Sequence, residues 1–154
     1  MKRNGFTLVE IAVVVALVGL LVALGSMAIM KGVNNSRIKN SQAELEVLSA
    51  AVLQLAWDTG RWPNGEPRNI VSSAEMWDIS PDACGLMGND GSFGNNWKGP
   101  YYDGSIQDQW GNPYFFDPDY STTNGTRVVV GSFGPNGKGP NLYDSDDVYV
   151  LLDD

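Results

Sequence analysis

The chain begins with MKRNGFTLVE, residues 1–10, and continues with IAVVVALVGLLVALGSMAIM, residues 11–30. The first stretch holds two basic side chains, a glycine at position 5 and one acid, Glu10, whereas residues 11–30 carry no charge. An apolar run of this length can cross a bilayer as one helix, and basic residues ahead of it predict a cytoplasmic tip and an exported remainder. Glu10 stands where hydrocarbon would surround it, which makes it a functional candidate.

Gly5 followed by FTLVE (residues 6–10) and an apolar helix resembles the class III signal of type IV pilins and type II secretion pseudopilins. The resemblance implies that a prepilin peptidase cleaves after Gly5 and methylates the new terminus, Phe6. It also implies that Glu10 registers the incoming subunit by pairing with its freed amine as a helical filament grows. An ordinary signal peptide is the competing interpretation, but residues 25–27 match its cleavage site poorly.

The helical pattern continues beyond the apolar run. Apolar residues recur there at spacings of three and four, namely Leu45, Leu48, Val52 and Leu55, which predicts an amphipathic helix to about Trp57. Gly60 can take the left-handed conformation that ends a helix, and Pro63 prevents its resumption. We therefore expect four parts: a leader 1–5, a transmembrane or filament-core helix 6–30, its amphipathic continuation 31–59 and a globular head 60–154.

The head is expected to combine a variable loop with a small sheet. Residues 64–96 are rich in turn formers, with one short helix predicted at 72–77. The segment DQWGNPY (108–114) resembles the opening of the C-terminal sheet in major pseudopilins, and its Gly-Asn-Pro turn leads into a predicted strand at 114–116. Further strands are predicted at 127–131 and 148–152. An antiparallel sheet packed on the long helix gives an α+β fold.

Two segments within 108–152 form a candidate calcium loop. Residues 132–137 are rich in glycine, and residues 144–147 hold three carboxylates, whose repulsion a cation or solvent must relieve. Ca²⁺ takes six to eight oxygen ligands. The arrangement resembles the calcium loop of major type II pseudopilins. This resemblance implies as ligands the carbonyl of Phe133 and the side chains of Asn136, Asp144, Asp146 and Asp147. Asn136 replaces an Asp of that family, and a solvated acidic turn without an ion is the alternative.

Composition excludes several classes of function. The formal charge is −8, and removal of the leader with its two basic residues would take it to −10, so we expect no nucleic-acid binding. The chain has no histidine, no nucleophile elbow and no phosphate-binding loop, which predicts that it is not an enzyme. Its single cysteine, Cys84, cannot form an intramolecular disulfide. A buried thiol is the simplest interpretation, and an intermolecular bridge is the alternative.

We therefore expect a structural subunit of a type II secretion pseudopilus. The resemblance implies a single-pass inner-membrane precursor with a periplasmic head that forms a helical homopolymer. Its implied partners are minor pseudopilins and the inner-membrane assembly platform. Two alternatives stay open. One is a type IV pilin for adhesion, motility or DNA uptake, although such pilins more often carry a disulfide. The other is a membrane-tethered carbohydrate-binding module that uses Trp97, Tyr101, Trp110 and the loop 64–96.

Overall fold

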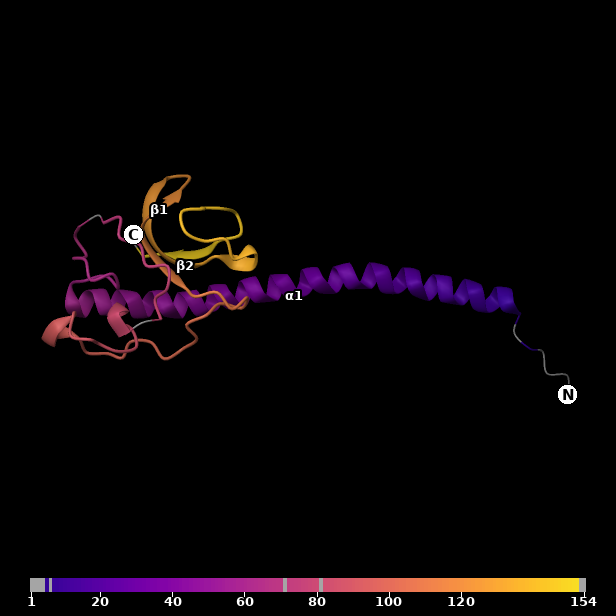
Figure 1. Cartoon of the computed structure of the whole chain (residues 1–154), viewed down its shortest axis with the longest axis horizontal. Coiled ribbons are helices and arrows are strands. Elements are labelled where there is room, and N and C mark those ends of the chain that lie inside the picture. The colour runs from indigo at the N-terminus through magenta and orange to yellow at the C-terminus, as the bar shows by residue number, and fades with distance from the viewer. Residues whose placement is uncertain (1–4, 6, 71, 81, 153–154) are drawn as a thin grey trace. The chain divides into compact units, whose positions relative to one another are not determined.

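The computed structural model describes residues 5, 7–70, 72–80 and 82–152. One long helix, α1 (Leu8–Thr59), precedes three strands, β1 (Phe115–Thr122), β2 (Gly125–Ser132) and β3 (Val148–Leu151), and three short 3₁₀ turns. The chain divides into two compact units between Ser36 and Arg37, and each unit is described by itself. Within the second unit, the sheet packs against the C-terminal half of α1, an α+β pilin-like arrangement (Figure 1).

The predicted amphipathic half of α1 is confirmed. The four apolar residues expected to face the head are all buried, with exposures of 1% or less: Leu45, Leu48, Val52 and Leu55. The helix ends as expected, because Gly60 has a φ of 71° and donates its N–H to the carbonyl of Ala56 at 3.0 Å. The hydroxyl of Thr59 caps the same end by donating to the Leu55 carbonyl at 2.7 Å.

The sheet is antiparallel, with strand order β1-β2-β3. Phe115 pairs with Gly131 across β1 and β2, and Val130 pairs with Val150 across β2 and β3. The register of β1 shifts between Asp117 and Tyr120, a bulge that surrounds Pro118. Proline has no N–H to donate to the hydrogen bonds between strands, so within sheets it is confined to edge strands and bulges. The position of Pro118 therefore explains the bulge.

Both faces of the sheet carry buried residues in β1 and β2. Alternate residues of a strand point to opposite faces, so Phe116 and Val130 join the helix-side core, whereas Phe115 and Val129 join a second cluster with Phe133. Trp77 covers this second cluster, with its ring 5.9 Å from that of Phe115. The sequence predicted one buried face for the strands, and the loop between the helix and the sheet supplies the cover for the other.

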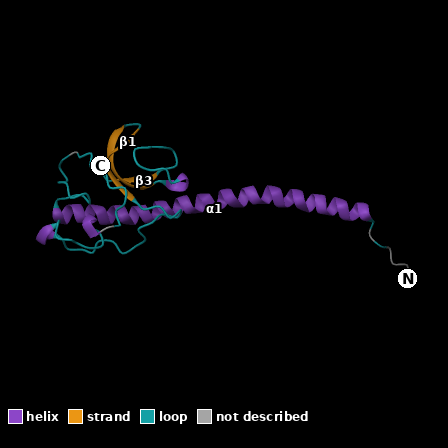
Figure 2. Ribbon diagram, in the orientation of Figure 1, coloured by secondary structure: helices purple, strands orange, loops and turns teal. Residues whose placement is uncertain are grey.

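The predicted helix at 72–77 is wrong. Residues 72–75 have no regular structure, and Met76 forms an isolated bridge with Phe116, exchanging two hydrogen bonds of 2.8 Å. Pairing with β1 satisfies the backbone of Met76, so it does not need an intrahelical partner. The predicted strand at 114–116 was too short, because β1 continues through the bulge to Thr122. Figure 2 shows that loops make up much of the head.

Candidate functional site

Thr7 and Glu10 form a capping box at the start of α1. The backbone N–H and the hydroxyl of Thr7 both donate to Oε2 of Glu10, at 2.8 and 2.9 Å. The N–H of Glu10 in turn donates to Oγ1 of Thr7 at 3.3 Å. This reciprocal pair satisfies donors that every helix N-terminus leaves unpaired. Of the predicted processing residues, Gly5 is exposed, whereas Phe6 lies outside the described residues.

The helix beyond Glu10 presents an exposed apolar surface. Every side chain from Leu8 to Met30 other than Gly25 is exposed, including Leu21 at 69% and Met27 at 73%. Such a patch far exceeds what a soluble monomer leaves in water. The helix contains a stretch long and apolar enough to cross a membrane. Insertion into a membrane would cover this surface.

The predicted turn at 108–114 is a polar hub of the head. The carboxylate of Asp108, only 6% exposed, accepts hydrogen bonds from the N–H groups of Trp110 (2.9 Å) and Asn112 (2.8 Å). It also accepts one of 2.6 Å from the hydroxyl of Ser132, at the end of β2. Buried carboxylates are tolerated when donors surround them in this way. Asp108 thus connects the turn to the strand that leads into the candidate calcium loop.

Glu44 ties the same turn to the helix. Its Oε1 accepts a hydrogen bond of 2.9 Å from the side-chain amide of Gln109, and its Oε2 accepts one of 2.5 Å from the hydroxyl of Tyr114. Burial and the neighbouring Glu44 raise the pKa of Tyr114, so the phenol stays protonated and keeps donating. The turn is therefore held from two sides, by a helix carboxylate and by Asp108.

The two halves of the candidate calcium loop meet beside this hub. Gly134 begins a 3₁₀ turn directly after Phe133. The carbonyl of Gly134 accepts a hydrogen bond of 3.3 Å from the side-chain amide of Asn112. A Cβ on Gly134 would lie 1.9 Å from the main-chain oxygen of Asp146. The close approach, together with a φ of 62°, requires glycine there.

The predicted calcium ligands are brought together in pairs. The amide of Asn136 donates to Oδ2 of Asp144 at 2.8 Å, and the N–H of Asp146 donates to Oδ1 of Asp144 at 2.9 Å. These two hydrogen bonds hold the pKa of Asp144 below its usual value. The bond from the N–H of Asp146 has the larger effect, and the bond from the side-chain amide of Asn136 has the smaller one. Phe133 packs its ring on Phe115, at 4.7 Å between centroids, so its side chain belongs to the second apolar cluster.

Asp147 is the ligand candidate whose environment is incomplete. Its Oδ2 accepts a hydrogen bond of 2.6 Å from the hydroxyl of Tyr120, whereas its Oδ1 is buried without a hydrogen-bond partner. Burial raises the pKa of Asp147, against the opposing effect of the Tyr120 bond. Within the described parts of the chain, no three Asp, Glu or Cys side chains converge as a metal-binding group. The loop supplies oxygens without forming a closed carboxylate cage.

Two of the aromatic residues considered for carbohydrate binding, Trp97 and Tyr101, pack against the helix-side core. The indole N–H of Trp97 donates to the carbonyl of Gly85 at 2.7 Å, and its ring stands edge-on to Tyr101. The hydroxyl of Tyr101 donates to Asp58 on α1 at 3.2 Å. Cys84 is fully buried and free, as the sequence predicted.

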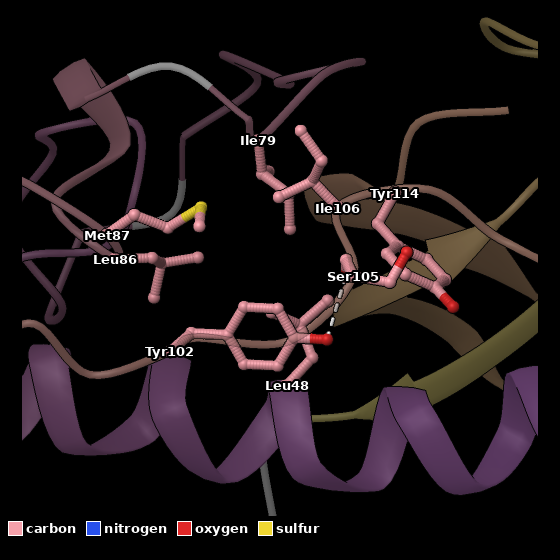
Figure 3. Close-up of a pocket in the computed structure, with 8 residues that line it drawn as sticks. All are labelled: Leu48, Ile79, Leu86, Met87, Tyr102, Ser105, Ile106 and Tyr114. Atoms are coloured by element: carbon pink, nitrogen blue, oxygen red, sulfur yellow. Dashed lines mark hydrogen bonds between the residues drawn. The ribbon is translucent and has the colours of Figure 1, made fainter.

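The apolar crevice drawn in Figure 3 is too narrow to hold a water-sized sphere. It lies between α1 and the loops of the head. In the close-up, the hydroxyl of Tyr102 points toward Ser105 and donates to its carbonyl at 2.8 Å. The crevice is lined by Leu48, Ile79, Leu86, Met87, Tyr102, Ser105, Ile106 and Tyr114. This part of the core therefore offers no room for a ligand.

Sequence reasoning missed two features of these sites. The Thr7 partner of Glu10 was available from the T-x-x-E spacing, which is the signature of a capping box. The second feature is a pair of acids in the β1 bulge, Asp117 and Asp119, each with a buried oxygen that has no partner. Nothing in their local sequence distinguishes them from solvated turn residues.

Residues 1–26 match the family model of the prokaryotic N-terminal methylation motif. The chain therefore carries the prepilin signal of type IV pilin-like proteins at the start of a long apolar helix. The motif implies, in general, processing by a prepilin peptidase and assembly into a filament. Together with the apolar helix, it fits a membrane-anchored protein that crosses the membrane once. Proteins with this motif are structural proteins rather than enzymes. No curated protein and no solved structure matches the chain.

The contact between Gly134 and Asp146 gives a test of the loop. We expect Gly134→Ala to lower the free energy of unfolding by about 3 kcal/mol, because it adds a steric clash to the cost of a left-handed alanine. Gly137→Ala is the matched control. Its φ is also positive, at 60°, but the nearest atom to a new Cβ is the Asn112 side chain at 3.1 Å.

The control should cost about 1–2 kcal/mol, mainly from backbone conformation, because the end of the Asn112 side chain has to shift by only a few tenths of an ångström. The measurement is urea unfolding of the full chain in detergent micelles, followed by tryptophan fluorescence. Equal losses for the two variants would show that the segment 144–147 does not pack on Gly134.

Proposed function

We propose that this chain is a structural subunit of a type II secretion pseudopilus. It would assemble from the inner membrane into a helical filament that drives protein export across the periplasm. The observation that carries the proposal is Glu10, an acid within the prepilin signal and at the start of an exposed apolar helix.

Glu10 is placed to accept a partner from a second subunit. Cleavage after Gly5 would free an α-amine on Phe6, and such an amine on the neighbouring subunit can hold a carboxylate charged in apolar surroundings. Both bonds from Thr7 go to Oε2 of Glu10, so the capping box orients the carboxylate and Oε1 can accept the incoming amine. An unpaired acid in the same place would oppose insertion, which gives the pairing its specificity.

Features of the head favour a pseudopilus over a surface pilus. Cys84 is buried and free, so no disulfide staples the C-terminal region. Stabilisation comes from the Asp108 hub in the segment that resembles major pseudopilins. In this proposal the head lies in the periplasm, and minor pseudopilins and the inner-membrane assembly platform are the partners of the growing filament.

We also propose that the loop formed by 133–136 and 144–147 binds Ca²⁺. Its support is the orphan Oδ1 of Asp147 and the oxygen-rich surroundings of Asp144 and Asn136. An ion there would neutralise the acidic turn and hold it against Gly134 and the end of β2. The remaining coordination would come from main-chain carbonyls, such as that of Phe133, and from water.

The assembly role of Glu10 can be tested by substitution. We expect Glu10→Ala or Glu10→Val to give a processed, membrane-bound monomer whose filament yield falls by about tenfold or more, because loss of a buried pair costs about 3–5 kcal/mol. Glu46→Ala removes an exposed glutamate from the same helix and serves as the control. Sheared-filament assays and electron microscopy give the yield. Normal filaments from the Glu10 variants would contradict the pairing.

The role in secretion is tested in cells that make the chain at its native level. Deletion should stop the export of secreted proteins across the outer membrane, and the parent chain but not Glu10→Ala should restore it. Export is measured as enzyme activity in the culture medium. Unimpaired export together with the loss of long surface fibres would instead identify a type IV pilin.

The calcium loop is tested with Ca²⁺ and a chelator. Saturation at 100 times the Kd should add about 2.7 kcal/mol of stability and raise the Tm of the full chain in micelles. Asp144→Asn should lower the number of Ca²⁺ ions bound per chain by one, whereas Asp103→Asn, at an exposed acid outside the loop, should not. Equilibrium dialysis counts the ions, and an unchanged count in Asp144→Asn would remove this loop as a site.

A further inference from the structure

We propose that Asp117 and Asp119, in the bulge of β1, bind a divalent cation of the oxygen-preferring class that includes Ca²⁺. This site is separate from the acidic turn at 144–147. It goes beyond the proposed function, because a filament subunit needs no ion at this position.

The bulge brings the two carboxylates to one side. The ladder between β1 and β2 is interrupted between Asp117 and Tyr120, so the chain turns around Pro118. The N–H of Asp119 donates to Oδ1 of Asp117 at 2.9 Å, which closes the turn. The two carboxyl groups then lie within hydrogen-bonding reach of each other. A regular strand would also place residues 117 and 119 on one face, but farther apart.

Each carboxylate buries an oxygen that has no partner. Asp117 is fully buried, and its Oδ2 accepts no hydrogen bond. Oδ1 of Asp119 is also buried and without a donor. Burial of an unpaired charged oxygen costs several kcal/mol, and two such groups side by side add repulsion. Asp108, in the same head, shows the usual solution, in which three or more donors surround the buried carboxylate.

Further oxygens and negative charge face the pair from neighbouring elements. The exchange of hydrogen bonds between Met76 and Phe116 brings Glu75 close enough for its charge to act on Asp117. Tyr143, from the loop after β2, stands edge-on to Tyr120 at 4.8 Å between ring centroids, and its phenol experiences the charges of Asp117 and Asp119.

Burial, the neighbouring Asp119 and the charge of Glu75 raise the pKa of Asp117. This direction agrees with the two orphan oxygens, because both indicate negative charge that the protein donors around the pair do not compensate. A divalent cation bound between the two carboxylates would compensate it.

The ligand set suits calcium more than a transition metal. The donors are two carboxylates, with the phenol of Tyr143 nearby, and the chain has no histidine. Hard cations prefer such oxygens. Three carboxylates do not converge in the described residues, so Glu75 contributes charge while water and carbonyls complete the shell. A bound ion would thereby fix the bulge of β1 against the loop that carries Tyr143.

The test counts ions on a background in which the acidic turn is disabled. Full-length Asp144→Asn in detergent micelles, stripped with chelator, is dialysed against radioactive Ca²⁺, and Asp117→Asn is then added to the same chain. We expect one Ca²⁺ per chain in the single variant and none in the double variant. Tb³⁺ luminescence excited through tyrosine should fall in parallel, because Tyr143 and Tyr120 lie beside the site.

Two results would overturn the inference. The first is absence of bound Ca²⁺ in Asp144→Asn, and the second is equal binding by the single and double variants. A rise in Tm caused by Asp117→Asn without loss of an ion would identify a proton-sharing pair instead. If Asp117→Asn fails to fold by circular dichroism, Asp119→Asn, at a partly exposed position, replaces it with the same expected loss. None of these outcomes depends on filament assembly, so the proposed function stands or falls separately.

Discussion

The buried carboxylate of Asp108 is the constraint on which the C-terminal part of the head depends. It receives hydrogen bonds from the turn that precedes β1 and from Ser132 at the end of β2. These two segments are distant in sequence, so a single acid fixes the hairpin relative to its entry turn. Glu44 then attaches the same turn to α1. Breaking such a network would leave a buried charge without donors, which costs more than the contacts themselves contribute.

Three other acids of the head have a buried carboxylate oxygen, and they differ in how well they are satisfied. Asp147 has one donor, from Tyr120, and one orphan oxygen, and the pair of Asp117 and Asp119 has an orphan oxygen on each member. All three lie in or beside the sheet of a chain whose formal charge is −8. Backbone and hydroxyl donors therefore compensate some of this charge, and the two proposed cation sites lie where such donors are missing. The head thus combines an extensive apolar core with a small set of incompletely satisfied acids.

The sequence predicted what depends on local spacing. Three- and four-residue spacing located the buried face of α1, and Gly60 marked its end, because both follow from helix geometry alone. The motif around Glu10 was equally visible. The short helix at 72–77 was predicted wrongly because a non-local bridge between Met76 and Phe116 replaced local hydrogen bonding. The burial of Asp117 could not be predicted, because it depends on which loops cover the bulge.

The two halves of α1 meet different environments, and the capping box shows how the first half can meet both lipid and protein. In the monomer, Thr7 gives Glu10 two donors on one oxygen, which lowers the cost of holding a carboxylate at an apolar boundary. A partner amine would add a charge-assisted bond without first removing those two. Assembly would then gain the full intermolecular interaction, while the helix terminus stays capped throughout. An acid one position earlier or later would lose the reciprocal bond, so the Thr7–Glu10 spacing links helix initiation to subunit recruitment.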